Sequence, residues 1–195
     1  MSMYKLCKTE QSANRQRQLE QGLLSAMLTR HYDEISVSDL CAQLNIPRKA
    51  FYRYFDGKEG ALHALLDHTL MDYESAPVLY SEGESRTLAK DMEQFFVFWI
   101  DQKPLLDALQ RSGLSGVLIE RAIAQALGEV AVPGRFLKAE APGNRQYVTM
   151  LGVCGLMSMV LQWHHGGYQE SPGNLAMVAI RLLTCPLFPN AEKLL

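Results

Sequence analysis

The stretch that decides the fold covers residues 36–59 and reads SVSDLCAQLNIPRKAFYRYFDGKE. It begins with Ser36, followed three residues later by Asp39, a spacing typical of the capping box that opens a helix. Asn45 tolerates the left-handed backbone conformation, so it can end this first short helix in a sharp turn. Pro47 suits the first position of a second short helix. Two short helices joined by a tight turn predict a helix-turn-helix module.

Working outward, the rest of the chain also shows apolar residues at helical spacing. Asp56 and Glu59 have the spacing of a second capping box, and Ser171-Pro172 has the form of a cap followed by a first helical residue. We therefore predict an all-α fold of about nine helices. The predicted helices cover residues 12–30, 37–44, 48–54, 56–73, 86–101, 105–111, 115–129, 144–165 and 172–184.

The composition changes after Ser75, where Pro, Gly, Ser and Glu residues break the helical pattern. We expect a domain boundary there. Residues 1–75 would form a helix-turn-helix DNA-binding domain of three helices and a bracing fourth, and residues 76–195 a second helical domain. A chain of 195 residues with 48% hydrophobic residues can bury its core without disulfides or metals.

The local charge is the first sign of a nucleic-acid partner. The whole chain carries 19 basic and 21 acidic residues and a net charge of −2. Residues 46–58 reverse this sign, because they hold four basic residues and one acid. The charge of a local patch, not the net charge, governs binding to DNA.

The second short helix has the two faces that a recognition helix needs. Phe51 and Phe55, spaced i and i+4, can anchor it, and Lys58 at the start of the next helix can hold a phosphate. We expect double-stranded DNA as the partner. The residues expected to face the DNA are Arg48, Lys49, Ala50, Tyr52, Arg53, Tyr54 and Lys58. A plain solvated basic face over an aromatic core is the alternative for the same pattern.

Residues 14–75 resemble the signature of the TetR family of transcriptional regulators, most specifically from Tyr52 to Lys58. The sequence departs from that signature with Asn45 in place of the usual turn glycine and Cys41 in place of the usual alanine. The resemblance implies that Ser36, Tyr52 and Lys58 hold phosphates. It also implies that base edges are faced by Ser38, Arg48, Lys49, Ala50 and Arg53.

The same resemblance implies that residues 76–195 form a helical regulatory and dimerisation domain, which dimerises through its last two helices, here residues 144–184. The segment from Tyr147 to Trp163 supports this, because its apolar residues point in nearly every direction and need burial on two sides. A homodimer reading a near-palindromic operator is the expected assembly.

A small apolar effector is the further expectation for the second domain, and it would release a repressor from DNA. Aromatic and methionine clusters also form plain cores, so a packed interior remains the alternative. The candidate pocket residues are Phe95, Phe96, Phe98, Trp99, Met150, Cys154 and Met157. Without an effector, regulation would come from protein abundance or a protein partner.

Other classes of function find little support in the sequence. The cysteines and histidines match no metal spacing, and no motif for a catalytic site, nucleotide or cofactor is present. A small helical enzyme or a pure interaction module would not need the basic helix. The N-terminus lacks the apolar run of a signal peptide, and no apolar stretch reaches the length of a membrane span. We expect a soluble, cytoplasmic protein.

Overall fold

The computed structural model describes residues 3–76, 87–128 and 145–184, which are helical apart from one isolated antiparallel bridge between Tyr4 and Phe55. This confirms the predicted all-α class and, within these ranges, the predicted number of nine α-helices. The elements are α1 (Glu10–Met27), the 3₁₀ helix η1 (Tyr32–Glu34), α2 (Val37–Gln43), α3 (Arg48–Phe51), α4 (Lys58–Ser75), α5 (Leu88–Asp101), α6 (Lys103–Arg111), α7 (Ser115–Ala126), α8 (Arg145–His165) and α9 (Pro172–Thr184).

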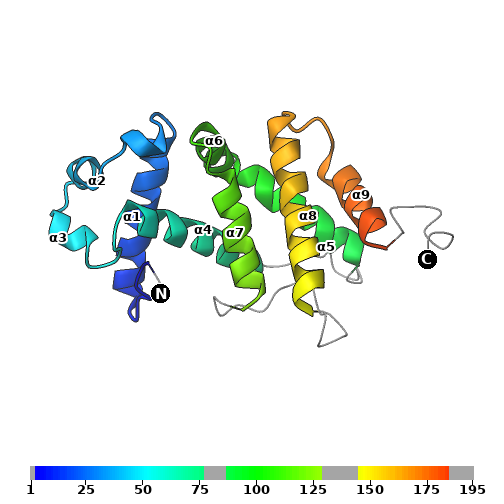
Figure 1. Ribbon diagram of the computed structural model, residues 1–195, viewed down its shortest axis with the longest axis horizontal. Helices are drawn as coiled ribbons and strands as arrows, with labels where there is room; N and C mark the ends of the chain where they lie inside the picture. Colours follow the sequence, from blue (N-terminus) through cyan, green and yellow to red (C-terminus); the bar gives the residue numbers. More distant parts are fainter. Residues whose placement is uncertain (1–2, 77–86, 129–144, 185–195) are drawn as a thin grey trace. The chain divides into compact units, whose positions relative to one another are not determined.

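The helices divide into two compact units, of which the first holds α1–α4 with α6 and α7. In this unit α2 packs on α1 and α3 packs on α2, and Figure 1 shows α2 and α3 as two short helices joined by a tight turn. Apolar side chains that lie on α1, α2, α3 and α4 contribute to its core. The buried residues include Leu19, Leu23, Met27, Leu40, Phe51, Phe55, Leu62 and Leu66.

The second compact unit holds α5, α8 and α9. Both α8 and α9 pack on α5, and the contact of α9 with α5 is the more extensive. Phe96 of α5 meets Trp163 of α8 edge to face, with ring centroids 5.8 Å apart. The small buried residues Ala176 and Ala179 let α9 lie close to α5. The division of the chain at residue 75 by function stays a prediction.

Several helix boundaries differ from the predicted ones. α3 ends at Phe51 instead of Tyr54, and Pro47 is its N-cap residue instead of its first helical residue. The predicted capping box at Asp56 is wrong, because α4 begins at Lys58 and the Asp56 N–H donates to the Met3 carbonyl at 3.0 Å. The Ser171 cap is confirmed, since its hydroxyl accepts the Asn174 N–H at 3.2 Å.

Candidate DNA-binding surface

The start of α2 is fixed by the capping box that the sequence predicts. The Ser36 hydroxyl accepts the Asp39 N–H at 3.1 Å, and Asp39 Oδ2 accepts the Ser36 N–H at 3.0 Å. The Ser36 hydroxyl also donates to Asp39 Oδ2 at 2.8 Å, and these bonds from Ser36 lower the pKa of the Asp39 carboxyl. Ser36 and Ser38 are both exposed, so either side chain can reach a ligand.

The turn between α2 and α3 has the geometry expected of a tight helix-turn-helix. Asn45 has a φ of 50°, the left-handed conformation predicted for it. The Ile46 N–H then donates to the Cys41 carbonyl at 2.9 Å, and the Ile46 side chain is buried. The turn is therefore held by its own backbone and anchored to the core.

α3 presents a buried aromatic side and an exposed basic side. Phe51 and Phe55 are both 1% exposed, and their ring centroids lie 5.1 Å apart. Among the residues expected to face DNA, Arg48, Lys49, Tyr52 and Arg53 are exposed, whereas Ala50 and Tyr54 are half-buried. Arg48 carries its guanidinium 6.0 Å from the centre of the Tyr52 ring. This division leaves the basic side chains free to meet an anionic partner.

Lys58 lies half-buried at the first residue of α4. Its Nζ donates to the Tyr32 carbonyl at 2.6 Å and lies 4.1 Å from the centre of the Tyr32 ring. Burial lowers the pKa of Lys58 and raises that of Tyr32 to about 12. An ammonium group has three donors, so two N–H groups of Lys58 stay available for a phosphate.

An N-terminal arm, defined here as residues 3–7, braces the end of the recognition segment. The Lys5 N–H donates to the Tyr54 carbonyl at 2.9 Å, and the arm accepts the Asp56 N–H as described above. Gly60 makes this approach possible, because a Cβ at this position would lie 2.2 Å from the Met3 carbonyl oxygen. A pairing this short leaves no periodic signal, and our sequence analysis missed it.

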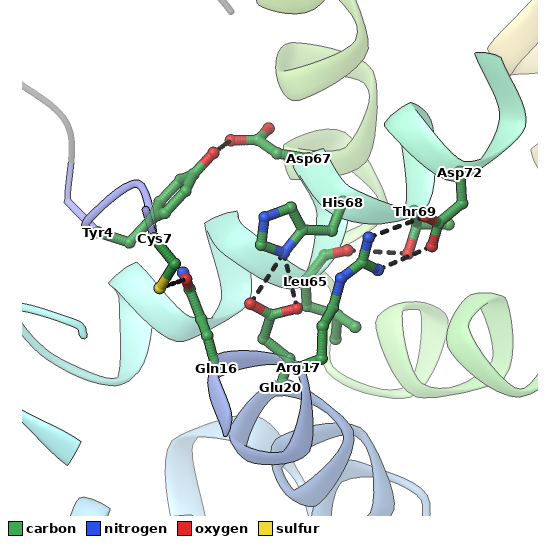
Figure 2. A network of polar contacts seen from close by, with 10 residues as sticks. All are labelled: Tyr4, Cys7, Gln16, Arg17, Glu20, Leu65, Asp67, His68, Thr69 and Asp72. Carbon is green, nitrogen blue, oxygen red and sulfur yellow. Dashed lines mark hydrogen bonds and ion pairs between the residues drawn. The ribbon is translucent and has the colours of Figure 1, made fainter. Parts of the chain in front are cut away.

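The arm is also tied to the helices behind α3 by a buried polar cluster. The Tyr4 hydroxyl donates to Asp67 Oδ2 at 2.7 Å (Figure 2), and Arg121 of α7 donates to both oxygens of the same carboxylate at 2.7 Å. Burial and the neighbouring Asp67 carboxylate raise the pKa of Tyr4, so it donates as the neutral phenol. Asp67 is fully buried, and its charge is balanced by Arg121.

Two polar side-chain pairs fasten α1 to α4 beside this cluster, as Figure 2 shows. Glu20 is fully buried, and both of its carboxylate oxygens lie 2.9 Å from His68 Nδ1. Burial raises the pKa of the Glu20 carboxyl. Arg17 forms a two-bond pair with Asp72, at 2.7 and 2.8 Å, on the exposed side. The scaffold that carries α3 is thus fixed by polar bonds as well as by its core.

The residues expected to line an effector pocket differ in how far they are buried within the second unit. Phe95, Phe96 and Trp99 are buried and meet edge to face, with centroid distances of 5.2 Å for Phe95–Phe96 and 6.3 Å for Phe95–Trp99. Phe98 is half-buried and meets Trp99 at 5.6 Å. On α8, Met157 is buried, Cys154 is half-buried and Met150 is exposed. The structure thus gathers the four aromatic residues of α5 and separates Met150 from the core.

Among the described residues there is no cluster of three or more metal-ligating side chains, and none of the helices there is long and apolar enough to cross a membrane. Two short helices with a buried aromatic side and an exposed basic side define the class of the protein. These two helices form a helix-turn-helix module, the arrangement that DNA-binding regulators use to enter the major groove.

Comparison with known proteins agrees with this class. Residues 26–65 match the family described as “Bacterial regulatory proteins, tetR family”. A tetR-family transcriptional regulator from Streptomyces coelicolor is similar in structure, with a TM-score of 0.52 and 23% identity over 88% of this chain and 79% of that one. The dihydroxyacetone kinase operon activator DhaS has a TM-score of 0.52 and 13% identity over 86% of this chain and 93% of its own. No curated protein matches the sequence.

The matched residues 26–65 lie within the stretch whose sequence resembles the TetR family, so this comparison and the resemblance agree on the N-terminal helices.

Proposed function

We propose that this chain is a homodimeric repressor that binds a near-palindromic operator with two copies of α3. The observation that carries the proposal is the division of α3 into a side anchored by Phe51 and Phe55 and a side that exposes Arg48 and Lys49. One module offers too small a surface for tight specific binding, so two modules related by a two-fold axis are needed. A dimer bound to an operator that overlaps a promoter would block the transcription machinery in the cytoplasm, and repression is the outcome we propose.

The proposed dimer forms through residues 144–184. α8 and α9 expose large apolar side chains, among them Tyr147 at 65%, Leu151 at 76% and Met177 at 56%. Val178, Leu182 and Leu183 of α9 are also exposed. Several large exposed apolar side chains on two helices favour an interaction site, and a second copy of the same two helices is the proposed occupant.

The proposed effector is a largely apolar small molecule with one hydrogen-bond acceptor, bound beside the aromatic residues of α5. The supporting observation is Trp99, which is fully buried and whose Nε1 has no hydrogen-bond partner among the described residues. A buried donor without a partner costs about 1–3 kcal/mol, which an acceptor on the ligand would recover.

A short chain of hydrogen bonds in the first unit offers a route by which a shift of α6 could reach the DNA-binding surface. The Tyr32 N–H donates to the hydroxyl of Ser112, which follows α6, at 3.0 Å. The carbonyl of the same residue holds Lys58 at 2.6 Å. An effector that shifts α6 would move Tyr32 and with it a proposed phosphate contact. A coupling of about 1–3 kcal/mol would change operator occupancy about 5- to 150-fold.

The DNA-binding part of the proposal is tested by two substitutions measured on an operator duplex and a scrambled duplex. Lys58→Ala should weaken binding to both duplexes by the same factor and lower the log–log salt slope by about one per subunit. Arg48→Ala should instead relax sequence preference, at about 1–3 kcal/mol if it contacts a guanine. If both variants lose the same affinity for both duplexes, our assignment of Lys58 to phosphate contact and of Arg48 to base recognition is wrong.

The effector part is tested by a thermal-shift screen of apolar and amphipathic metabolites, followed by operator release. A compound that stabilises the wild-type protein should stabilise Trp99→Phe less, because the ring is kept and the donor is removed. If no compound stabilises the protein or releases DNA, control by protein abundance or by a protein partner is the alternative.

A further inference from the structure

A polar hollow of about 710 Å³ lies beside the recognition segment, within the first compact unit. One side is formed by the first half of α1 and the other by Arg53 and Tyr54, which follow α3. Every side chain that lines it is polar or charged. The hollow is therefore unsuited to an apolar ligand and suited to an ion.

Two arginines from different elements face this hollow. Arg15 of α1 donates one N–H to Gln18 Oε1 at 3.0 Å, and Arg53 has no hydrogen bond or ion pair with the described part of the chain. A guanidinium has five donors, so both side chains keep most of theirs for a ligand. Glu10 is the one carboxylate among the lining residues and pairs with neither arginine in the described ranges.

Other arginines of the same unit show what a structural arginine looks like here. Arg17 is bonded to Asp72 through two hydrogen bonds, and Arg121 is bonded to Asp67 in the same way. Arg30 lies 3.7 Å from Asp39. Arg15 and Arg53 lack such a carboxylate partner, although they line one hollow together.

The position of the hollow identifies the anion. It adjoins the residues that directly follow α3, and the sugar–phosphate strands run along both edges of the groove that a recognition helix enters. Planar guanidinium groups bind phosphate oxygens through paired hydrogen bonds. The backbone of the bound duplex is thus the phosphate source nearest to both arginines.

We propose that Arg15 and Arg53 form a clamp for one backbone phosphate of the operator. This inference rests on the proposed DNA-binding function and deepens it. It gives α1 a part in DNA binding and changes the role of Arg53, which the sequence resemblance placed at base edges. Arg53 becomes a residue that positions the duplex, while Arg48 and Lys49 remain the candidates for reading bases.

The test compares wild type with Arg15→Gln, Arg53→Gln, the double variant and Arg17→Gln, by fluorescence anisotropy on operator and scrambled duplexes over a range of salt. Arg17→Gln is the matched control, because it removes the same charge from the same helix two residues away. Circular dichroism melting checks that each variant is folded.

We expect Arg15→Gln and Arg53→Gln each to weaken binding to both duplexes by the same factor. Each should also lower the log–log salt slope of binding by about 0.9 per subunit. Arg17→Gln should leave the slope at its wild-type value. A wild-type slope for Arg15→Gln, or a loss confined to the operator for Arg53→Gln, would overturn the clamp while DNA binding stands. A wild-type protein that binds no duplex would instead remove the proposed function itself.

A second arm separates duplex phosphate from a free anion. Inorganic phosphate is titrated into the protein without DNA and followed by calorimetry. Weak binding that is equal for wild type and the double variant supports the duplex as the ligand. Tight binding lost in the double variant, with unchanged salt slopes on DNA, would make the hollow a small-anion site and overturn the clamp.

Discussion

The two ends of this chain expose opposite kinds of side chain. Around α2 and α3 the large apolar residues Leu40, Phe51 and Phe55 are buried, and the exposed side chains include the basic Arg48 and Lys49. On α8 and α9 the exposed residues include large apolar ones, with Leu151 at 76%. The difference indicates that the first compact unit exposes a surface suited to an anion around α2 and α3, whereas α8 and α9 expose side chains suited to another apolar surface.

The largest expected effect comes from a substitution in the proposed dimer interface of the C-terminal helices. Leu151→Glu places a carboxylate in the proposed interface twice, once from each copy, and an unpaired buried charge costs several kcal/mol. We expect the dissociation constant of the dimer to rise by more than about 1,000-fold. Analytical ultracentrifugation should show a folded monomer that has lost tight operator binding.

Gln21→Glu of α1 is the matched control for this change, because it adds the same charge at an exposed polar residue outside the proposed interface. It should remain dimeric. A Leu151→Glu protein that stays dimeric and binds its operator as wild type does would place the interface elsewhere.

The next prediction tests the claim that buried polar bonds hold the first compact unit together. Asp67→Asn removes the buried charge that balances Arg121 and accepts the Tyr4 hydroxyl. Breaking a buried pair on one side costs about 3–5 kcal/mol, and we expect a loss of that order in the free energy of unfolding. Urea denaturation measures it. Asp72→Asn, which affects only the exposed pair with Arg17, should cost less than about 1 kcal/mol.

A glycine pair tests the N-terminal arm. Gly60→Ala puts a Cβ 2.2 Å from the Met3 carbonyl oxygen, which forces the arm away from α4. Overpacking of this kind costs about 1–3 kcal/mol, seen as a lower midpoint in urea. Gly57→Ala, where a Cβ would meet nothing within 4 Å, is the control. Equal midpoints for the two variants would contradict the packing of the arm described here.

The smallest effect concerns a single hydroxyl in the same cluster. Tyr4→Phe keeps the buried ring and removes the bond to Asp67, which retains Arg121. The expected loss in unfolding free energy is about 1 kcal/mol. A loss as large as that of Asp67→Asn would mean that Arg121 contributes little, and that the tyrosine holds the cluster together.

The sequence predicts the parts of the fold that depend on neighbours along the chain. Ser36 and Asp39 form their capping box, Asn45 turns the chain with a φ of 50°, and Phe51 and Phe55 anchor the recognition segment, all as expected. Each of these follows from local backbone chemistry or from helical spacing.

The features that the sequence could not predict depend on residues brought together by the tertiary fold. The arm pairs with Tyr54 and Asp56 across about 50 residues, and its carbonyl takes the N–H that a capping box at Asp56 needs. The hollow between Arg15 and Arg53 joins a helix to a segment beyond the turn. Spacing along the chain carries no signal for either arrangement.

Selection of bound sites from random duplex DNA tests the central claim most directly, because it requires no assumption about the operator. The account predicts one enriched, near-palindromic sequence with half-sites about one helical turn apart or a multiple of it, bound by two chains. Recovery of no preferred sequence by the folded dimer, or of an asymmetric site bound by one chain, would contradict it.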